Sequence, residues 1–409
     1  MSKNTRMAAI AWLLAALYYF YQYIMRSSPG VMMEQLSESF GLSTLGVASM
    51  LGFFYYAYSP FSLVAGAAMD RLGTRKVVPI GAITVGIGAL LFSTGNQTFG
   101  TIGRFLQGAG GVFALIGAVY IASKYFPPSK AATLIGATQM FGMAGGSAGQ
   151  FAVGPLMSRG VSVQSYWLWM GIGGLVIGAI LWFMLPKDEV ARQKGSWLKS
   201  AVEAFKVVFK NPQSILCGII AGLIFIPTTI FDMVWGVRFL QDSHGIDYSA
   251  AILRSASVPF GWIIGCPLMG YISDRIGRRK PVIISGATVL LLCLIFILFG
   301  RPGIFPPFVP GLIAGIASGS AMITYSVIKE ANPPHLSGTA TGVINFINFT
   351  FSALLGPVFA WLLTRVSAGS PEMEHYHYQL AFLPLLFGVL IAILLTLKLK
   401  ETGSASRIS

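Results

Sequence analysis

Long apolar runs alternate with short polar breaks along the whole chain, and this pattern predicts a protein built from membrane-spanning helices. Each run is about 20 residues long, which is the length a helix needs to cross the hydrocarbon core of a bilayer. Helices are expected because backbone groups in lipid must form hydrogen bonds within their own segment. The predicted spans are 9–32, 44–66, 77–95, 101–124, 131–156, 166–186, 212–236, 247–271, 281–299, 306–330, 337–362 and 379–398.

The longest polar break divides these twelve spans into two sets of six. We therefore predict an N-terminal six-helix bundle over residues 1–186, a cytoplasmic linker over 187–211 and a C-terminal six-helix bundle over 212–409, which ends in a short cytoplasmic tail. Section 197–209 of the linker has the pattern of an amphipathic helix that lies on the membrane surface.

Composition also favours a protein that crosses the membrane many times. Apolar residues make up 55% of the chain and charged residues 10%, against about 25% charged residues in ordinary soluble domains. The net charge is +14, but 21 of the 28 Lys and Arg lie in the tails or in loops on the side of the N-terminus. This is the positive-inside pattern, so we expect an inner-membrane protein with both termini in the cytoplasm, and no nucleic-acid partner.

The sequence gives no support to an enzyme or a metalloprotein. The three cysteines lie in apolar runs without the spacing of metal ligands or of a disulfide framework. No nucleophile, base and orienting group occur at a recognisable spacing, and no phosphate-binding loop precedes a helix. We therefore expect no enzymatic activity, no cofactor and no metal.

A charged loop occurs twice, and the interval between its copies reveals a duplication. The second copy follows the first by 204 residues in a chain of 409, and further pairs of residues repeat at an interval of 206. An even number of spans in each half makes the two copies parallel, which is a transporter plan with a pseudo-twofold axis along the membrane normal. The repeated residues are Gly66-Ala-Ala-Met-Asp70-Arg71-Leu-Gly73-Thr-Arg75-Lys76 with Gly270-Tyr-Ile-Ser-Asp274-Arg275-Ile-Gly277-Arg278-Arg279-Lys280, and Gly136 and Gln139 with Gly342 and Asn345.

The loop resembles the signature of the major facilitator superfamily and departs from it only at Thr74, where a basic residue is usual. Residues 104–110, Arg-Phe-Leu-Gln-Gly-Ala-Gly, resemble the second motif of that superfamily. The resemblance covers nearly the whole chain. It implies an all-α membrane protein with twelve transmembrane helices in two pseudo-symmetric six-helix bundles, and it also implies a monomer.

Two interpretations of the charged loops remain open from the residues alone. Asp70 and Asp274 either cap helix ends and mark topology, or form salt bridges that hold the two halves closed on the cytoplasmic side. The resemblance implies the second interpretation and makes the loops gating elements. The candidate gating residues are Gly66, Asp70, Arg71, Gly73, Arg75, Lys76, Gly270, Asp274, Arg275, Gly277, Arg278, Arg279 and Lys280.

Few charged residues lie within the spans. Asp232 is the one acid well inside a span, and the cations within spans are Arg26, Arg104 and Arg254. Ionisable groups at membrane depth usually face a cavity or pair with one another. Arg254 lies near the outer end of its span and is also compatible with an interfacial position. Glu330, at the cytoplasmic edge of a span, is interpreted as an interface cap.

Arg26 and Asp232 occupy equivalent positions in the two halves, because they are 206 residues apart. Tyr19, Tyr23 and Arg26 fall on one helical face, and we predict that Arg26 faces Asp232 across a central cavity. Asp232 is the candidate proton-coupling residue, since desolvation of a carboxyl favours its protonation. The alternatives are that Arg26 extends to the outer membrane surface and that Asp232 forms only a helix-to-helix hydrogen bond.

An excess of fixed cations over anions in the cavity favours an anionic substrate, since Arg is suited to carboxylates. The first span also resembles that of organic-anion/proton symporters of the superfamily, although Met25 replaces the acid that often precedes the arginine there, and span four lacks an acid. The candidate substrate-binding residues are Tyr19, Tyr23, Arg26, Arg104, Gln139, Trp235, Asn345 and Asn348.

The function predicted from the sequence is proton-coupled uptake of a small organic anion by alternating access. The alternative is proton-driven efflux of drugs, siderophores or metabolites, for which the glycines between Gly142 and Gly149 partly resemble an exporter motif. The same glycines are equally suited to close helix packing. A receptor that has lost transport is a third class, disfavoured by the intact loops in both halves. The expected partners are a small-molecule substrate, protons and the lipid bilayer.

Overall fold

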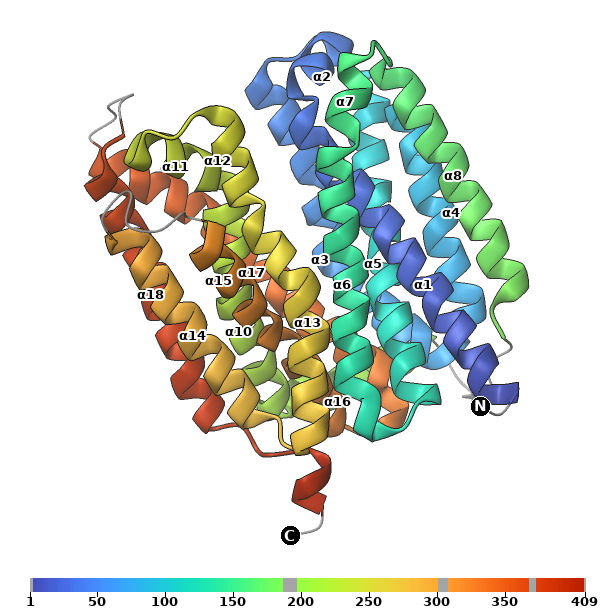
Figure 1. Cartoon of the computed structure of the whole chain (residues 1–409). Coiled ribbons are helices and arrows are strands. Elements are labelled where there is room, and N and C mark those ends of the chain that lie inside the picture. Colours follow the sequence, from blue (N-terminus) through green and yellow to red (C-terminus); the bar gives the residue numbers. More distant parts are fainter. Residues whose placement is uncertain (1–2, 187–196, 301–307, 368–372, 408–409) are drawn as a thin grey trace. The chain divides into compact units, whose positions relative to one another are not determined.

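The computed structural model of the chain describes residues 3–186, 197–300, 308–367 and 373–407. Within these ranges the regular secondary structure is helical and contains no strand (Figure 1). Ten helical stretches in the described ranges are long and apolar enough to cross a membrane. The predicted spans 44–66 and 131–156 coincide largely with two further helices, α3 (Thr44–Leu72) and α6 (Ala131–Phe151). The all-helical prediction is therefore confirmed.

The chain forms two compact units. Unit 1 contains Met1–Pro127, Phe141–Lys210 and Asn332–Phe346, and unit 2 contains Pro128–Met140, Asn211–Ala331 and Ile347–Ser409. Two helices therefore pass from one unit to the other: α6 begins in unit 2, and α17 (Ser337–Val366) begins in unit 1. The predicted bundles 1–186 and 212–409 differ from these units by the two exchanged half-helices, and residues 187–196 of the predicted linker lie outside the described residues.

The helices of unit 1 begin and end at local signals in the sequence. Asn96 caps the helix that follows it, because its side chain accepts hydrogen bonds from the backbone N–H groups of Thr98 and Phe99. Gly73 ends α3 with a φ of +76°, in the region that favours glycine. Besides α3 and parts of α6 and α17, the unit contains α1 (Lys3–Ser27), α2 (Met33–Phe40), α4 (Thr74–Phe92), α5 (Gln97–Tyr125), α7 (Val153–Ser158), α8 (Val163–Met184) and α9 (Trp197–Lys210).

Unit 2 has an irregular helix at its start. Asn211 caps α10 (Pro212–Ile226), and the same rod continues as a π-helical segment, Pro227–Trp235, before α11 (Gly236–His244). Pro227 has no N–H to donate to the preceding turn, and this interrupts the regular α-helical hydrogen bonds at that point. The remaining helices are α12 (Tyr248–Ser255), α13 (Ser257–Ile276), α14 (Lys280–Phe299), α15 (Phe308–Ser318), α16 (Ile323–Glu330), the rest of α17, and α18 (His375–Leu397).

Glycines bring backbones into direct contact at equivalent places in the two units. In unit 1, a Cβ on Gly66 of α3 would come within 2.5 Å of the carbonyl oxygen of Gly338, at the start of α17. In unit 2, a Cβ on Gly270 of α13 would overlap the carbonyl oxygen of Ala132, at the start of α6. Close approach of this kind is typical of helix packing in membranes. We call the contact between α3 and α17 the glycine seam of unit 1.

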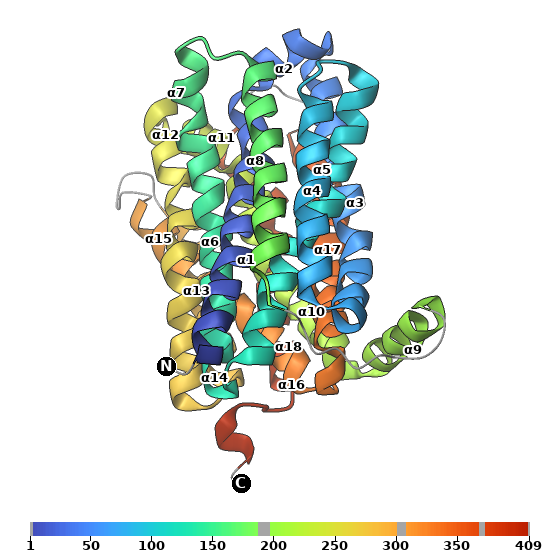
Figure 2. The same ribbon diagram turned by 90° about the vertical axis from the view of Figure 1, so that its right-hand side faces the viewer.

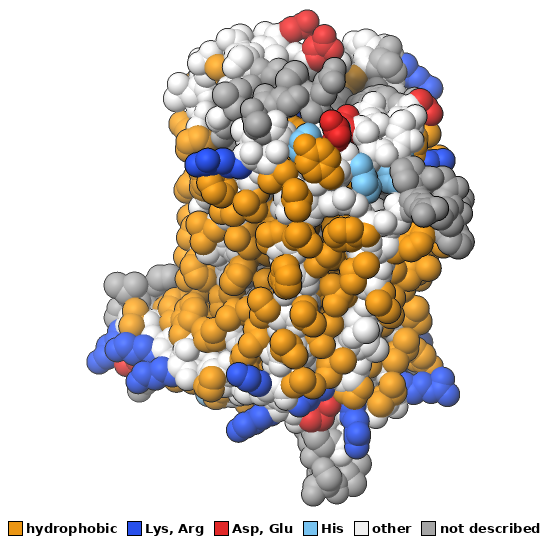
Figure 3. Space-filling model, turned by 90° about the vertical axis from the view of Figure 1, so that its left-hand side faces the viewer, with side chains coloured by type: hydrophobic (Ala, Val, Ile, Leu, Met, Phe, Trp, Pro, Cys, Tyr) orange, Lys and Arg blue, Asp and Glu red, His pale blue; other side chains and the backbone are white. Residues whose placement is uncertain are grey.

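One face of unit 2 is suited to lipid. Figure 3 shows a broad apolar surface with Lys and Arg gathered near one end and acidic residues and His near the other. The exposed apolar side chains of unit 2 include Leu292, Ile295 and Phe296 of α14 and Phe387 and Leu394 of α18. In unit 1, α9 runs at a steep tilt to α4 and α8, as Figure 2 shows. This helix occupies the section in which an amphipathic helix was predicted.

Candidate functional site

Unit 1 holds an arginine surrounded by aromatic rings. The guanidinium carbon of Arg26, at the end of α1, lies 4.9 Å from the ring centre of Tyr23 and 5.0 Å from that of Tyr55. Phe54 and Tyr58 lie at 5.7 and 5.6 Å. Arg26 Nε also donates a hydrogen bond to the Tyr55 hydroxyl, at 3.3 Å. Cation–π contacts are worth about 0.5–2 kcal/mol each, so the rings hold the cation without neutralising its charge.

A second arginine lies beside the same ring of Phe54. Arg104 of α5 is 2% exposed, and its guanidinium carbon lies 5.1 Å from the centre of the Phe54 ring. Its Nη1 donates to Gln107 Oε1 at 2.6 Å and to the Met25 carbonyl at 3.3 Å. Among the described residues Arg104 forms no ion pair. Phe54 therefore contacts two guanidinium groups.

Acidic residues are scarce around these two cations. Helices α1 and α5 contain no Asp or Glu, and the one acid of α3 is Asp70, at its far end. Arginine side chains are suited to bind anionic groups such as carboxylates. The two arginines therefore form a candidate anion site lined by aromatic rings. We call it the arginine site.

The structure brings together only some of the predicted substrate-binding residues. Tyr19 and Tyr23 are buried at the arginine site, with their ring centres 4.9 Å apart. Asn345 also lies in unit 1, but its amide donates to Ser62 Oγ at 2.8 Å, which is a helix-to-helix contact. Gln139, Trp235 and Asn348 belong to unit 2.

In unit 2, Asn348 is 4% exposed and donates to the Tyr325 hydroxyl at 3.5 Å. Gln139 is 2% exposed, and Trp235 packs against the hydrophobic core of the unit. Arg26 belongs to unit 1 and Asp232 to unit 2, so the pairing of these two residues stays a prediction.

Asp232 lies in the π-helical segment and faces a small cavity within unit 2. It is 9% exposed, and its Oδ1 accepts a hydrogen bond from Ser255 Oγ at 3.1 Å. The cavity also touches Arg254, which forms no ion pair with Asp232. Asp232 therefore makes the helix-to-helix hydrogen bond that was the alternative interpretation, and it faces a cavity as well.

Asp70 binds the start of a helix that lies 268 residues away in the sequence. Its Oδ1 accepts from the Gly338 N–H at 2.7 Å, and its Oδ2 accepts from the N–H and the hydroxyl of Thr339 at 2.7 and 2.6 Å. Burial raises the pKa of Asp70 to about 6, against these hydrogen bonds, which lower it. The carboxylate is therefore charged at neutral pH and stabilises the positive end of the α17 dipole.

Asp70 has no ion pair among the described residues, and the first turn of α17 supplies three hydrogen-bond donors in place of a cation. The salt bridge between the two halves stays a prediction. Of the neighbouring gating residues, Gly66 lies in the glycine seam, Gly73 ends α3, Arg71 and Arg75 are partly exposed, and Lys76 is exposed.

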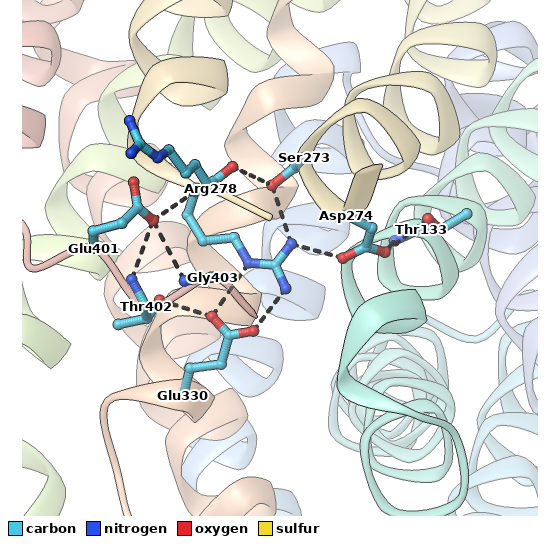
Figure 4. Close-up of polar contacts among 9 residues, drawn as sticks. Thr133, Ser273, Asp274, Arg278, Glu330, Glu401, Thr402 and Gly403 are labelled. Carbon is cyan, nitrogen blue, oxygen red and sulfur yellow. Dashed lines mark hydrogen bonds and ion pairs between the residues drawn. The ribbon is translucent and has the colours of Figure 1, made fainter. Parts of the chain in front are cut away.

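Asp274 makes the equivalent contact in unit 2 and adds an ion pair. Its Oδ2 accepts from the N–H and the hydroxyl of Thr133, both at 2.8 Å, and its Oδ1 lies 2.7 Å from Arg279 Nη1. Arg279 Nη2 lies 2.7 Å from Glu330 Oε1. Figure 4 shows that this network joins side chains from α6, α13 and α16. Asp274 therefore forms an ion pair with a residue of its own loop, and the predicted salt bridge between the two halves stays a prediction.

The C-terminal tail completes this network (Figure 4). Glu401 accepts hydrogen bonds from the backbone N–H groups of Arg279 and Lys280, at 2.6 and 3.2 Å, where α14 begins. Thr402 Oγ1 donates to Glu330 Oε2 at 2.7 Å. Burial lowers the pKa of Arg279, but its bonds to Glu330 and Asp274 outweigh burial and raise it. Its charge is therefore retained.

Glu330 is part of an ion pair and not the simple interface cap that was predicted. The other candidate gating residues of unit 2 form no part of this ion-pair network. Gly270 contacts the start of α6, Gly277 ends α13 with a φ of +70°, and Arg275 and Arg278 are exposed.

Several functional residues were missed by the sequence reasoning. Tyr55 and Tyr58 contact Arg26 from another helix, and they are spaced three apart on one face of α3. A rule that looks for aromatic pairs at that spacing would have found them. Thr133 and Thr339 are 206 residues apart, which is the interval of the repeat. The repeat could therefore have identified them as an equivalent pair. No signal in the sequence links Ser255 to Asp232.

The chain was compared with known proteins. The sequence profile described as Major Facilitator Superfamily matches residues 15–357. The hexuronate transporter of Bacillus subtilis is 23% identical over 82% of this chain and 83% of its own, and the cis,cis-muconate transport protein of Acinetobacter baylyi is 22% identical over 83% and 85%. The solved structure of the E. coli fucose:proton symporter FucP superposes with a TM-score of 0.75, at 13% identity, over 97% of this chain and 100% of that one.

Proposed function

Since this chain belongs to the Major Facilitator Superfamily and is a multi-pass membrane transporter and not an enzyme, we propose that it takes up a small organic anion together with a proton. The superfamily fold has twelve transmembrane helices in two six-helix bundles, and its members move small molecules by secondary transport. The proposal concerns what this chain carries and what drives the movement.

The observation that carries the proposal is the arginine site. The guanidinium carbons of Arg26 and Arg104 lie 5.7 and 5.1 Å from the centre of the same ring, that of Phe54. Arginine binds carboxylates in a bidentate manner, and the phenol groups of Tyr23 and Tyr55 offer further hydrogen bonds to a hydroxylated acid. Relatives named for hexuronate and muconate transport agree with a carboxylate substrate.

Asp232 is proposed as the proton carrier. It is a buried acid in a transmembrane helix, and such residues commonly serve proton relays in transporters. The contacts of Asp70 and Asp274 with the starts of α17 and α6 are proposed as gates that form and break in each cycle of alternating access. We further propose a monomer in the inner membrane with both termini in the cytoplasm.

The test uses purified full-length protein and a panel of mono-, di- and tricarboxylates, sugar acids and lipophilic cations. A ligand that binds only the folded protein stabilises it by about 2.7 kcal/mol at a hundred times its dissociation constant, which raises the melting temperature measurably. We expect stabilisation by one class of carboxylate, lost in Arg26→Ala and kept in Arg159→Ala, a control at an arginine outside the site. Stabilisation by lipophilic cations alone would overturn the proposal and favour efflux.

The coupling ion needs a second assay in liposomes. We expect the carboxylate identified above to carry protons inward with it, as reported by a pH-sensitive dye inside the vesicle. Asp232→Asn should abolish the proton movement and leave exchange of substrate across the membrane, since exchange needs no net proton transfer. Proton movement that persists in Asp232→Asn would contradict the role of this residue.

A further inference from the structure

We propose that the cavity beside Asp232 binds one small monovalent cation, held by the Asp232 carboxylate and the hydroxyls of Ser255 and Ser257. The occupant is Na⁺ or a proton carried on a water molecule, which share the same oxygen ligands. The inference deepens the coupling role of Asp232 in the proposed function. It adds the hydroxyls of Ser255 and Ser257 as ligands of the coupling cation, and it places this cation inside unit 2.

The size of the cavity is suited to an ion or a few water molecules. Its volume is about 40 Å³, which accommodates roughly two or three water molecules. Most of its wall is apolar, as with Phe231, Phe239 and Leu294. The polar groups come chiefly from Asp232 and from the junction between α12 and α13, where Ser255 and Ser257 lie.

Two oxygen atoms at the cavity have no hydrogen-bond partner among the described residues. Ser257 is fully buried, and its Oγ has no hydrogen-bond partner among the described residues. Asp232 Oδ1 accepts from Ser255, whereas its Oδ2 accepts no hydrogen bond from any residue that the structure describes. A buried polar group without a hydrogen-bond partner destabilises the fold. A ligand that contacts both atoms would relieve this penalty, which is why the cavity indicates a binding site.

The backbone around Asp232 is shaped for this arrangement. The residue lies in the π-helical segment, and π-helical turns occur frequently at functional sites. Gly236 lies beside the carboxylate, where a Cβ would come within 2.8 Å of Ser255 Oγ and 3.2 Å of Asp232 Oδ1. Glycine at this position therefore leaves room for the carboxylate and the hydroxyl to lie together.

Charge limits the occupant to a single positive charge. The titratable groups that line the cavity are Asp232 and Arg254, and the other lining residues, from the π-helical segment through α15, are neutral. Carboxylate and hydroxyl oxygens suit hard cations. The Arg254 guanidinium at the same wall opposes positive charge, so a divalent cation is disfavoured and a monovalent cation remains.

Binding of Na⁺ is tested on the purified full-length protein without substrate. Melting temperature is measured in NaCl and in choline chloride at equal ionic strength, over a range of pH. If Na⁺ is the occupant, NaCl raises the melting temperature. Ser257→Ala then needs about tenfold more Na⁺ for the same rise, a loss of about 1.4 kcal/mol, and Asp232→Asn shows no rise.

The matched control is Ser320→Ala. Ser320 is a fully buried serine of unit 2 whose hydroxyl also has no partner among the described residues, but it does not line the cavity. This variant should respond to NaCl like the natural protein. Gly236→Ala provides a second perturbation, because its methyl group displaces the Ser255 hydroxyl and should weaken the response without removing any ligand.

A proton as occupant gives a different pattern that also supports the proposal. NaCl then has no specific effect, acid raises the melting temperature, Asp232→Asn abolishes this rise, and Ser257→Ala moves its midpoint. The proposal is overturned if Ser257→Ala matches Ser320→Ala in both the salt and the pH series. Stabilisation by carboxylates depends on Arg26 and is measured separately, so failure of the cation site is distinguishable from failure of the anion site.

Discussion

The two copies of the charged loop have nearly the same sequence but different networks. In unit 1, Asp70 binds the first turn of α17 with three hydrogen bonds and has no ion pair among the described residues. In unit 2, Asp274 binds the first turn of α6 with two hydrogen bonds and also pairs with Arg279. The shared part is the contact between an aspartate and the start of a helix.

The difference arises from residues outside the motif. Arg279 bridges Asp274 and Glu330, and the residue 206 positions before Glu330 is Lys124. The helix end that supplies an acid in the second copy therefore supplies a cation in the first. The duplicated motif thus determines the contact between the aspartate and the start of a helix. Residues outside the motif determine whether an ion-pair network forms as well.

Removal of Arg279 should have the largest effect on this difference. Arg279→Ala leaves the carboxylates of Asp274 and Glu330 close together and largely buried, and loss of one partner from a buried pair destabilises by about 3–5 kcal/mol. We expect a clear fall in the melting temperature of the purified protein. Arg75→Ala, the matched change in the first copy, should cause a smaller fall, and equal effects would contradict the asymmetry.

Asp70→Asn should affect transport more than stability. The amide keeps one acceptor oxygen but turns an NH₂ group toward the donors of Thr339, so the charge-assisted hydrogen bonds, worth about 1.5–3 kcal/mol each, are weakened. We expect slower turnover in liposomes with nearly unchanged affinity for the substrate, measured by thermal stabilisation. A strong loss of affinity would show that Asp70 belongs to the substrate site and not to a gate.

The smallest effects test whether the shared contact is equivalent in the two units. Thr339→Val and Thr133→Val each remove one hydroxyl donor to an aspartate and keep the backbone donor. Each change should weaken its contact by no more than the 1.5–3 kcal/mol typical of a charged hydrogen bond, with similar reductions in turnover. A large effect of Thr133→Val alone would indicate that the ion-pair network depends on the α6 contact.

The sequence predicted most of the fold but only part of the sites. The lengths of the apolar runs predicted where the helices lie, because the thickness of the bilayer fixes the length of a span. The repeated loop identified Asp70, Asp274 and Arg279. It did not reveal that Asp70 binds Thr339, since this contact joins residues 269 positions apart and depends on how helices pack.

The small polar groups were the hardest to predict. Ser255 and Ser257 look like any serines near a helix end, and their significance comes from the cavity that they share with Asp232. The exchange of half-helices between the two units was equally hidden, because each half of the sequence looks complete when taken alone. Tyr55 and Tyr58 were overlooked although their spacing was visible.

The glycine seam of unit 1 has a consequence for the speed of the transport cycle. At Gly66 and Gly338 the two backbones meet directly, because neither residue has a side chain there. The hydrogen bonds across this contact include those of Asp70 and the one from Asn345 to Ser62. In the gate that we propose, these bonds break when α3 separates from the start of α17, so their combined strength should influence the rate of the cycle.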